Sequence, residues 1–179
     1  STVTKVEELD LQYTEIGPNG AKAITALCAV RGSLTVLTLS YNAIKDEGAI
    51  AIGHALRDNA DCKMQTLELV KCGIGAGGAG ALAAFCAVST SLTSIPRLGN
   101  KFDDETVAML LKVKEEKPAL ITLCGLKPDQ TKVDFRLKGL GPADAKLLAP
   151  EILVHTSLTR VDVAYNSMKA EGVKLLRDA

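Results

Sequence analysis

The residues that carry most enzyme and metal chemistry are few in this 179-residue chain, and they stand apart from one another. The two histidines, His54 and His155, have no cluster of cysteines or histidines at ligand spacing around them, and a zinc site needs such a cluster. No serine, histidine and aspartate, and no cysteine and histidine, are brought together by their spacing. We therefore expect no catalytic residue, no metal site and no cofactor.

One glycine-rich segment, residues 73–78, superficially resembles a phosphate-binding loop. It reads Gly-Ile-Gly-Ala-Gly-Gly and lacks the Lys-Ser/Thr ending of a P-loop. Small residues are placed in the same way elsewhere, at Gly20-Ala21 and Gly48-Ala49. We interpret all three segments as helix starts at which small side chains let helix and sheet approach closely.

The five cysteines are an odd number, and their positions argue against a disulfide framework. Cys28 and Cys86 stand in two similar segments, Leu-Cys-Ala-Val and Phe-Cys-Ala-Val, two repeats apart. Helices pack about 8–10 Å apart, so these thiols should lie about 20 Å apart, beyond the roughly 7 Å limit for a disulfide. We expect free thiols and a reducing, cytoplasmic setting.

A repeated leucine pattern indicates how the chain positions its other residues. From Leu34 to Ile44 the chain reads Leu-x-x-Leu-x-Leu-x-x-Asn-x-Ile, and degenerate copies follow along nearly its whole length. The strand anchors recur every 28 or 30 residues and restart once, at Leu9, Leu37, Leu67, Ile95, Leu123, Val133 and Val161. A fixed period of this size is typical of a solenoid.

Each repeat is expected to hold one short strand and one helix. In residues 37–39 apolar and polar side chains alternate, as in a half-buried strand, and Asn42 suits the turn that follows. Ile52 and Leu56 then share one helical face, which a single unit cannot bury without neighbours. We predict an α/β solenoid, a horseshoe arc with seven parallel strands on its concave face and six helices on its convex face.

Arg97 departs from this pattern. It falls where Leu39 points into the core, directly after Pro96. A buried, unpaired guanidinium is very costly. We therefore expect either a bulged strand or an arginine side chain that reaches solvent.

The largest departure lies between Leu123 and Val133. These two anchors are only 10 residues apart, and the segment between them, which contains Pro128, has no helical period. A parallel strand pair normally needs a longer crossover. We expect an extended, helix-free return there, with a gap in the helical layer near Val113 and Leu148.

The pattern resembles the leucine-rich repeat family, and its repeat length with helical returns resembles the ribonuclease-inhibitor-like subclass. The resemblance runs from Val6 to about Arg177. It implies a single leucine-rich repeat domain over residues 1–179, with about six strand–helix repeats and one truncated repeat near 120–132. A fragment of a longer array would show the same pattern.

The outward strand positions form the concave surface that solenoids of this kind use for binding. Its central positions are Asp10, Thr38, Glu68, Pro96, Cys124, Asp134 and Asp162. Four of these seven are acidic, and tyrosine and arginine, which are enriched at binding hot spots, lie around them. The predicted partner-binding residues are Glu8, Asp10, Gln12, Tyr13, Thr38, Tyr41, Glu68, Lys71, Asp134, Arg136, Arg160, Asp162 and Tyr165. Ordinary solvation of a strand surface is the alternative explanation.

The balance of charge argues against a nucleic-acid-binding or membrane-binding protein. Twenty-one basic residues balance 21 acidic ones, so the chain has no global attraction to nucleic acid or membrane. We predict a non-catalytic protein–protein interaction module that binds a protein partner, a basic one if the resemblance to ribonuclease inhibitor extends to its acidic inner face. The resemblance leaves two alternatives, a GTPase-activating-type regulator and a sensor domain of a larger receptor-like protein. The oligomeric state stays open.

Overall fold

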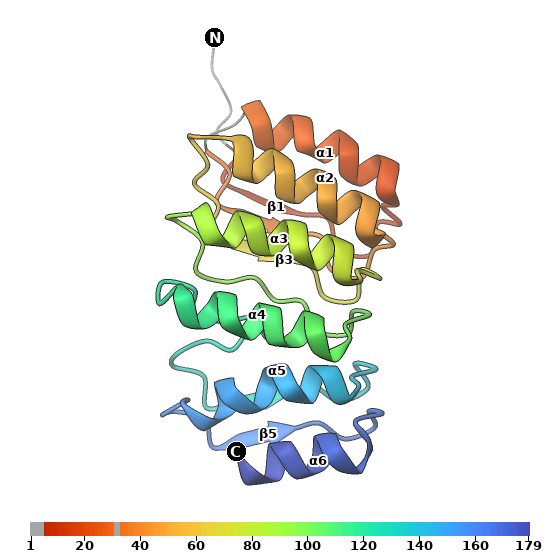
Figure 1. The fold of residues 1–179 in the computed structure, drawn as a ribbon, viewed down its shortest axis with the longest axis vertical. Helices are drawn as coiled ribbons and strands as arrows, with labels where there is room; N and C mark the ends of the chain where they lie inside the picture. Colours follow the sequence, from red (N-terminus) through yellow and green to blue (C-terminus); the bar gives the residue numbers. More distant parts are fainter. Residues whose placement is uncertain (1–5, 31–32) are drawn as a thin grey trace.

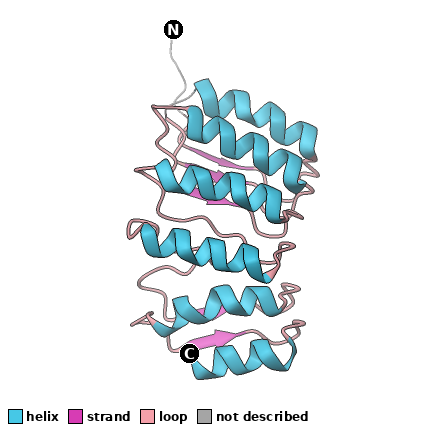
Figure 2. Cartoon of the chain, in the orientation of Figure 1, coloured by secondary structure: helices cyan, strands magenta, loops and turns pink. Residues whose placement is uncertain are grey.

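The computed structural model describes residues 6–30 and 33–179 and shows a stack of strand–helix units (Figure 1). The helices lie side by side on one face and the short strands lie behind them (Figure 2). The first and last helices, α1 and α6, are at opposite ends of the stack (Figure 1). The side chains of residues 27–30 are not described, so the expectation for Cys28 lies outside the described residues.

The described residues form six helices and five strands. The helices are α1 (Pro18–Val30), α2 (Lys45–Asp58), α3 (Ala76–Val88), α4 (Asp104–Glu116), α5 (Pro142–Leu153) and α6 (Lys169–Asp178). The strands are β1 (Glu8–Asp10), β2 (Val36–Thr38), β3 (Thr66–Glu68), β4 (Lys132–Asp134) and β5 (Arg160–Asp162). Each helix follows one of the predicted anchors, and the segment between Leu123 and Val133 is helix-free. The predicted fold class is confirmed.

The strands form two parallel sheets instead of one continuous sheet. β1, β2 and β3 pair in that order, and β4 pairs with β5, each with the predicted anchors in register. Beyond β3 the ladder continues only as single bridges, from Thr66 to Ser94 and from Ser94 to Thr122. The predicted count of seven strands was therefore wrong, because the strands near Ile95 and Leu123 reduce to these bridges.

Pro96 and Arg97 account for this irregular part of the ladder. The amides of Ile95 and Arg97 donate to the adjacent carbonyls of Thr122 and Leu123, at 3.0 and 3.1 Å. A regular ladder uses carbonyls two residues apart, so this pairing is bulged, as one of the two expectations for Arg97 required. The other expectation was wrong, because the arginine side chain is fully buried. Its Nε donates to the Ile95 carbonyl at 3.3 Å, and its Nη1 has no partner among the described residues.

Asparagine side chains tie each turn to the repeat before it. The Asn42 side chain accepts hydrogen bonds from the amides of Thr14 (3.2 Å) and Ile16 (2.9 Å) and donates to one carbonyl of the preceding repeat and two of its own. Asn100 makes the corresponding bonds in a later repeat, and Asn166 makes them with one accepted amide, that of Leu140, instead of two. The turn asparagine is therefore a cross-link between neighbouring repeats as well as a residue suited to the turn.

Glu151 of α5 completes the hydrogen bonding where the ladder stops. Its buried carboxylate accepts from the Leu123 amide (2.6 Å), the Thr122 hydroxyl (2.6 Å) and the Lys114 ammonium (2.8 Å). In the preceding repeats the corresponding amide, such as that of Ile95, donates to a carbonyl of the next strand. A helix side chain thus takes the place of the missing strand.

A second α5 carboxylate, Asp144, joins the two halves at the other end of the helix. It is buried and accepts from the amides of Gly99 (2.7 Å) and Gly141 (2.8 Å). Burial raises the pKa of Asp144, and the two amide hydrogen bonds oppose that rise. Despite the break between the sheets, one hydrophobic core runs from Ala21 to Met168.

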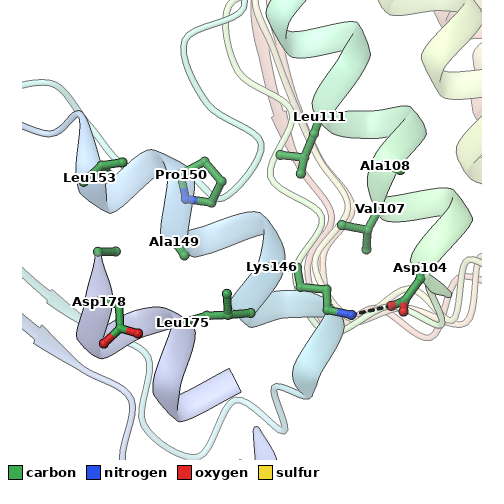
Figure 3. A pocket seen from close by; sticks show the side chains of 11 residues that line it. Asp104, Val107, Ala108, Leu111, Lys146, Ala149, Pro150, Leu153, Leu175 and Asp178 are labelled. Carbon is green, nitrogen blue, oxygen red and sulfur yellow. Dashed lines mark hydrogen bonds and ion pairs between the residues drawn. The ribbon is translucent and has the colours of Figure 1, made fainter. Parts of the chain in front are cut away.

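The helical layer is open between α4 and α5, the two helices between which a gap was expected. An apolar groove of about 600 Å³ lies there, with Leu111 on one side and Ala149 on the other (Figure 3). The Lys146 ammonium spans it to reach the Asp104 carboxylate at 2.8 Å. The opening is displaced from the predicted position, since neither Val113 nor Leu148 lines the groove. None of the helices in the described ranges has the length and hydropathy that crossing a bilayer demands.

Glycine sets the close packing of α2 on α3. A Cβ built on Gly53 would lie 2.9 Å from both the carbonyl carbon and the oxygen of Ala81. We expect Gly53→Ala to lower the free energy of unfolding by about 1–3 kcal/mol, because overpacking outweighs the better helix propensity of alanine. Urea denaturation checks this against Gly80→Ala, where a Cβ meets nothing within 4 Å. Equal stability of the two variants would contradict the close packing.

Candidate functional site

The predicted binding residues divide between the two sheets. Asp10 is exposed and Glu68 half-buried on the first sheet, whereas Asp134 is exposed on the second. Thr38 is only 7% exposed and therefore contributes little surface. The central positions of the two bridge segments, Pro96 and Cys124, are buried as well.

Arginines neutralise the acidic positions of the second sheet. Arg136 lies 2.7 Å from Asp134 and 3.7 Å from Asp162, and Arg160 lies 3.3 Å from Asp162. The hydrogen bonds from Arg136 lower the pKa of Asp134 to about 2. A continuous acidic ridge is therefore not present, since its second half is a network of paired charges.

Glu68 on the first sheet differs from these acids. Its side chain has no hydrogen bond and no ion pair to any residue within the described ranges. Burial raises the pKa of Glu68, nearby Asp10 raises it further, and Lys127 opposes the rise. Asp10 itself accepts hydrogen bonds from the amide (3.0 Å) and side chain (3.2 Å) of Gln12. Glu68 is thus a partly desolvated carboxylate at the centre of the concave face.

The three tyrosines after the strands have left-handed backbones. The φ angles of Tyr13, Tyr41 and Tyr165 are 53°, 61° and 58°, and that of Lys71 is 51°; such values are outliers for bulky residues. Tyr13 stacks on Tyr41 with 4.4 Å between the ring centroids and 12° between the planes. The Lys71 and Lys138 ammoniums lie 5.8 and 5.6 Å from the Tyr41 centroid. Gly99 and Leu137 have left-handed backbones at the equivalent positions, with φ of 71° and 56°, so the turn belongs to the repeat itself.

A cavity of about 260 Å³ on the concave face brings several of these side chains together. It extends from Gln12, after β1, to Lys138, after β4, and Glu68, Tyr41 and Asp134 also line it. The other nine predicted residues do not line this cavity; they are Glu8, Asp10, Tyr13, Thr38, Lys71, Arg136, Arg160, Asp162 and Tyr165. The inner surface therefore acts as one concavity although its sheet is split.

Lys138 and Phe135 also line the cavity, although the repeat pattern does not predict either as a binding residue. Lys138 stands where other repeats have the turn asparagine, and a hydrogen bond to Tyr41 raises its pKa. Phe135 occupies a strand position that the pattern assigns to the core. No group of three or more potential ligand side chains is arranged to hold a metal among the described residues.

A family model described as "Leucine Rich repeat" matches residues 4–24, 33–53, 60–83 and 154–176. Together with the stacked strand–helix units, this match decides the family. The chain is a leucine-rich repeat protein. The structure of the leucine-rich repeat chain resembles that of "Leiomodin-1 Actin-Binding Site 2 (ABS2)", with a TM-score of 0.51, 15% identity, and coverage of 96% of this chain and 79% of that one. At this identity the likeness shows the fold alone.

Two curated relatives of this leucine-rich repeat chain are a ribonuclease inhibitor and a GTPase-activating protein. Ribonuclease inhibitor of Mus musculus is 25% identical over 173 residues, which cover 96% of the chain and 36% of the relative. RAN GTPase-activating protein 2 of Arabidopsis thaliana is 27% identical over 120 residues, which cover 67% of the chain and 22% of the relative. The chain is ribonuclease-inhibitor-like, and it spans little more than a third of the first relative and less of the second.

Proposed function

We propose that this chain is a non-catalytic protein-interaction module that binds a partner protein through its concave face in the cytoplasm. The observation that carries the proposal is the cavity that draws side chains from the first repeat to the residues after β4. Exposed Tyr13 and the stacked Tyr41 beside it add the aromatic surface that is enriched at binding hot spots. The described cysteines, Cys62, Cys72, Cys86 and Cys124, are free thiols, which supports a reducing compartment.

The partner is proposed to present a basic surface. Asp134 and Asp162 are already paired with arginines, so attraction for a cation centres on Glu68 and Asp10. Complementary charges of this kind accelerate association more than they slow dissociation. Salt screens them over a Debye length of about 10 Å at 0.1 M ionic strength.

Affinity capture from a native lysate tests the proposal. Immobilised wild-type chain should retain a partner that a variant with both Asp10→Asn and Glu68→Gln loses, because the free acids attract it. Glu115→Gln, an exposed change in α4, is the matched control and should retain the partner. Raising the ionic strength should slow association more than it changes dissociation. A partner that cross-links to the convex helices and binds the concave variant normally would exclude this function.

The likeness to RAN GTPase-activating protein 2 supports a second candidate, regulation of a GTPase. It is the weaker one, because the match covers 67% of the chain and 22% of that relative. Measurement of GTP hydrolysis by a Ran-type GTPase, with and without the chain, separates the two candidates.

A further inference from the structure

We propose that the concave cavity receives one arginine side chain from the partner, whose guanidinium pairs with Glu68. The inference rests on the proposed function and specifies its central contact. Three features of the cavity lead to it. They are an unpaired carboxylate, apolar walls around a space that holds one long side chain, and other charged groups that already interact with protein partners.

The first feature is Glu68 itself. A carboxylate that is half-buried without a hydrogen-bond partner has lost water without gaining protein donors. A guanidinium can supply two parallel N–H donors to the two oxygens of one carboxylate, in the strongest kind of charged hydrogen bond. Docking of an arginine would therefore satisfy the carboxylate that the free chain leaves unpaired.

The second feature is the space around Glu68. The cavity holds about 260 Å³, and Val70, Leu98 and Phe135 give it apolar walls. Long basic side chains bury their methylene stems against apolar surface and keep the charged end in a polar place. One such side chain fits the cavity, with its stem on the apolar residues and its charge at Glu68.

The third feature is the state of the other charges in the cavity. Lys138 lines the wall, but its ammonium lies 5.6 Å from the centroid of the Tyr41 ring and interacts with Asp134. Asp134 in turn holds Arg136 at 2.7 Å. Glu68 is therefore the carboxylate of this cavity that is left for a ligand among the described residues.

Arginine is favoured over lysine by geometry. Its guanidinium is planar, more weakly hydrated than an ammonium, and able to lie flat against an aromatic ring such as that of Phe135. A lysine ammonium is a strongly hydrated point charge that would make one contact with Glu68.

The experiment uses the full chain and three short probes. Acetyl-Gly-Gly-Arg-Gly-Gly-amide, and the same peptide with lysine or citrulline in place of arginine, are titrated into the isotope-labelled chain. The amide signals of Val70 and Leu98 report occupancy by NMR. We expect the arginine peptide to bind several-fold tighter than the lysine peptide, and the uncharged citrulline peptide at least about tenfold weaker, since a charged hydrogen bond is lost.

Variants locate the contact. Glu68→Gln should weaken the arginine peptide at least about tenfold, and a spectrum otherwise like that of the wild type shows that it folds. Glu115→Gln should bind as the wild type does. Equal binding of the lysine peptide, or unchanged binding by Glu68→Gln, overturns the inference.

The two proposals fail separately. A chain that captures a partner through its concave face but does not bind the arginine peptide keeps the proposed function and loses this inference. A chain that binds the peptide at Glu68 but retains its partner when the concave acids are removed keeps the arginine site and loses the proposed function.

Discussion

Glu151→Ala should lower the free energy of unfolding by roughly 3–5 kcal/mol, as expected when one member of a buried ion pair is removed. The carboxylate lies 2.8 Å from the Lys114 ammonium and also accepts from the Leu123 amide and the Thr122 hydroxyl. Alanine leaves all three donors without this acceptor, and an unsatisfied buried donor carries its own desolvation cost. The loss should also weaken the coupling between the two sheets, because Glu151 lies where they are interrupted.

Urea denaturation measures this effect, with separate probes for the two halves of the chain. Glu116→Ala is the control, because Glu116 is exposed and makes only a 3.8 Å surface pair with Lys112. Surface pairs of this kind contribute about 0–1 kcal/mol. Glu151→Gln should fall between the two, since its amide oxygen can still accept a hydrogen bond. A Glu151→Ala chain as stable as the control would show that the carboxylate does not hold the interrupted sheet.

Leu67→Ala should cost roughly 2–5 kcal/mol, the usual range for a buried leucine. Leu67 is fully buried in the middle of β3, where it pairs in register with Leu37 of β2. Alanine at this position removes core contacts and leaves a cavity. Thermal unfolding should show a fall in Tm of about 2–4 °C per kcal/mol for a chain of this length. Leu137→Ala, at a leucine that is 73% exposed, is the control and should be nearly neutral.

Much of the fold followed from periodicity, because burial on one strand face and one helix face leaves a regular mark in the sequence. The spacing predicted all six helices and the helix-free segment between Leu123 and Val133. It failed at the strands near Ile95 and Leu123, where Pro96 and the buried Arg97 distort the ladder. The burial of Arg97 was not predictable from its neighbours in the sequence, since one of its hydrogen-bond acceptors is the Cys86 thiol of α3.

The candidate site was harder to predict, because the three-dimensional fold decides which of its acidic side chains are paired with basic ones. One pairing is local in the sequence, since Asp134 ends β4 and Arg136 lies in the turn two residues later. Periodicity carries no trace of the contact of Lys138, which reaches the ring of Tyr41 from a distant repeat. The absence of a partner for Glu68 likewise depends on where the fold places the lysine and arginine side chains.

The side chain that closes the interrupted ladder has a consequence for self-association. A sheet that ends inside a molecule presents open backbone amides, and such an edge can recruit a strand from another chain and start a fibril. Here the carboxylate of Glu151 already holds the amide of Leu123, and a negative charge at that position repels an incoming carbonyl edge. The solenoid can therefore lack the helix between Leu123 and Val133, and divide its sheet in two, without exposing a strand edge to which another chain could pair.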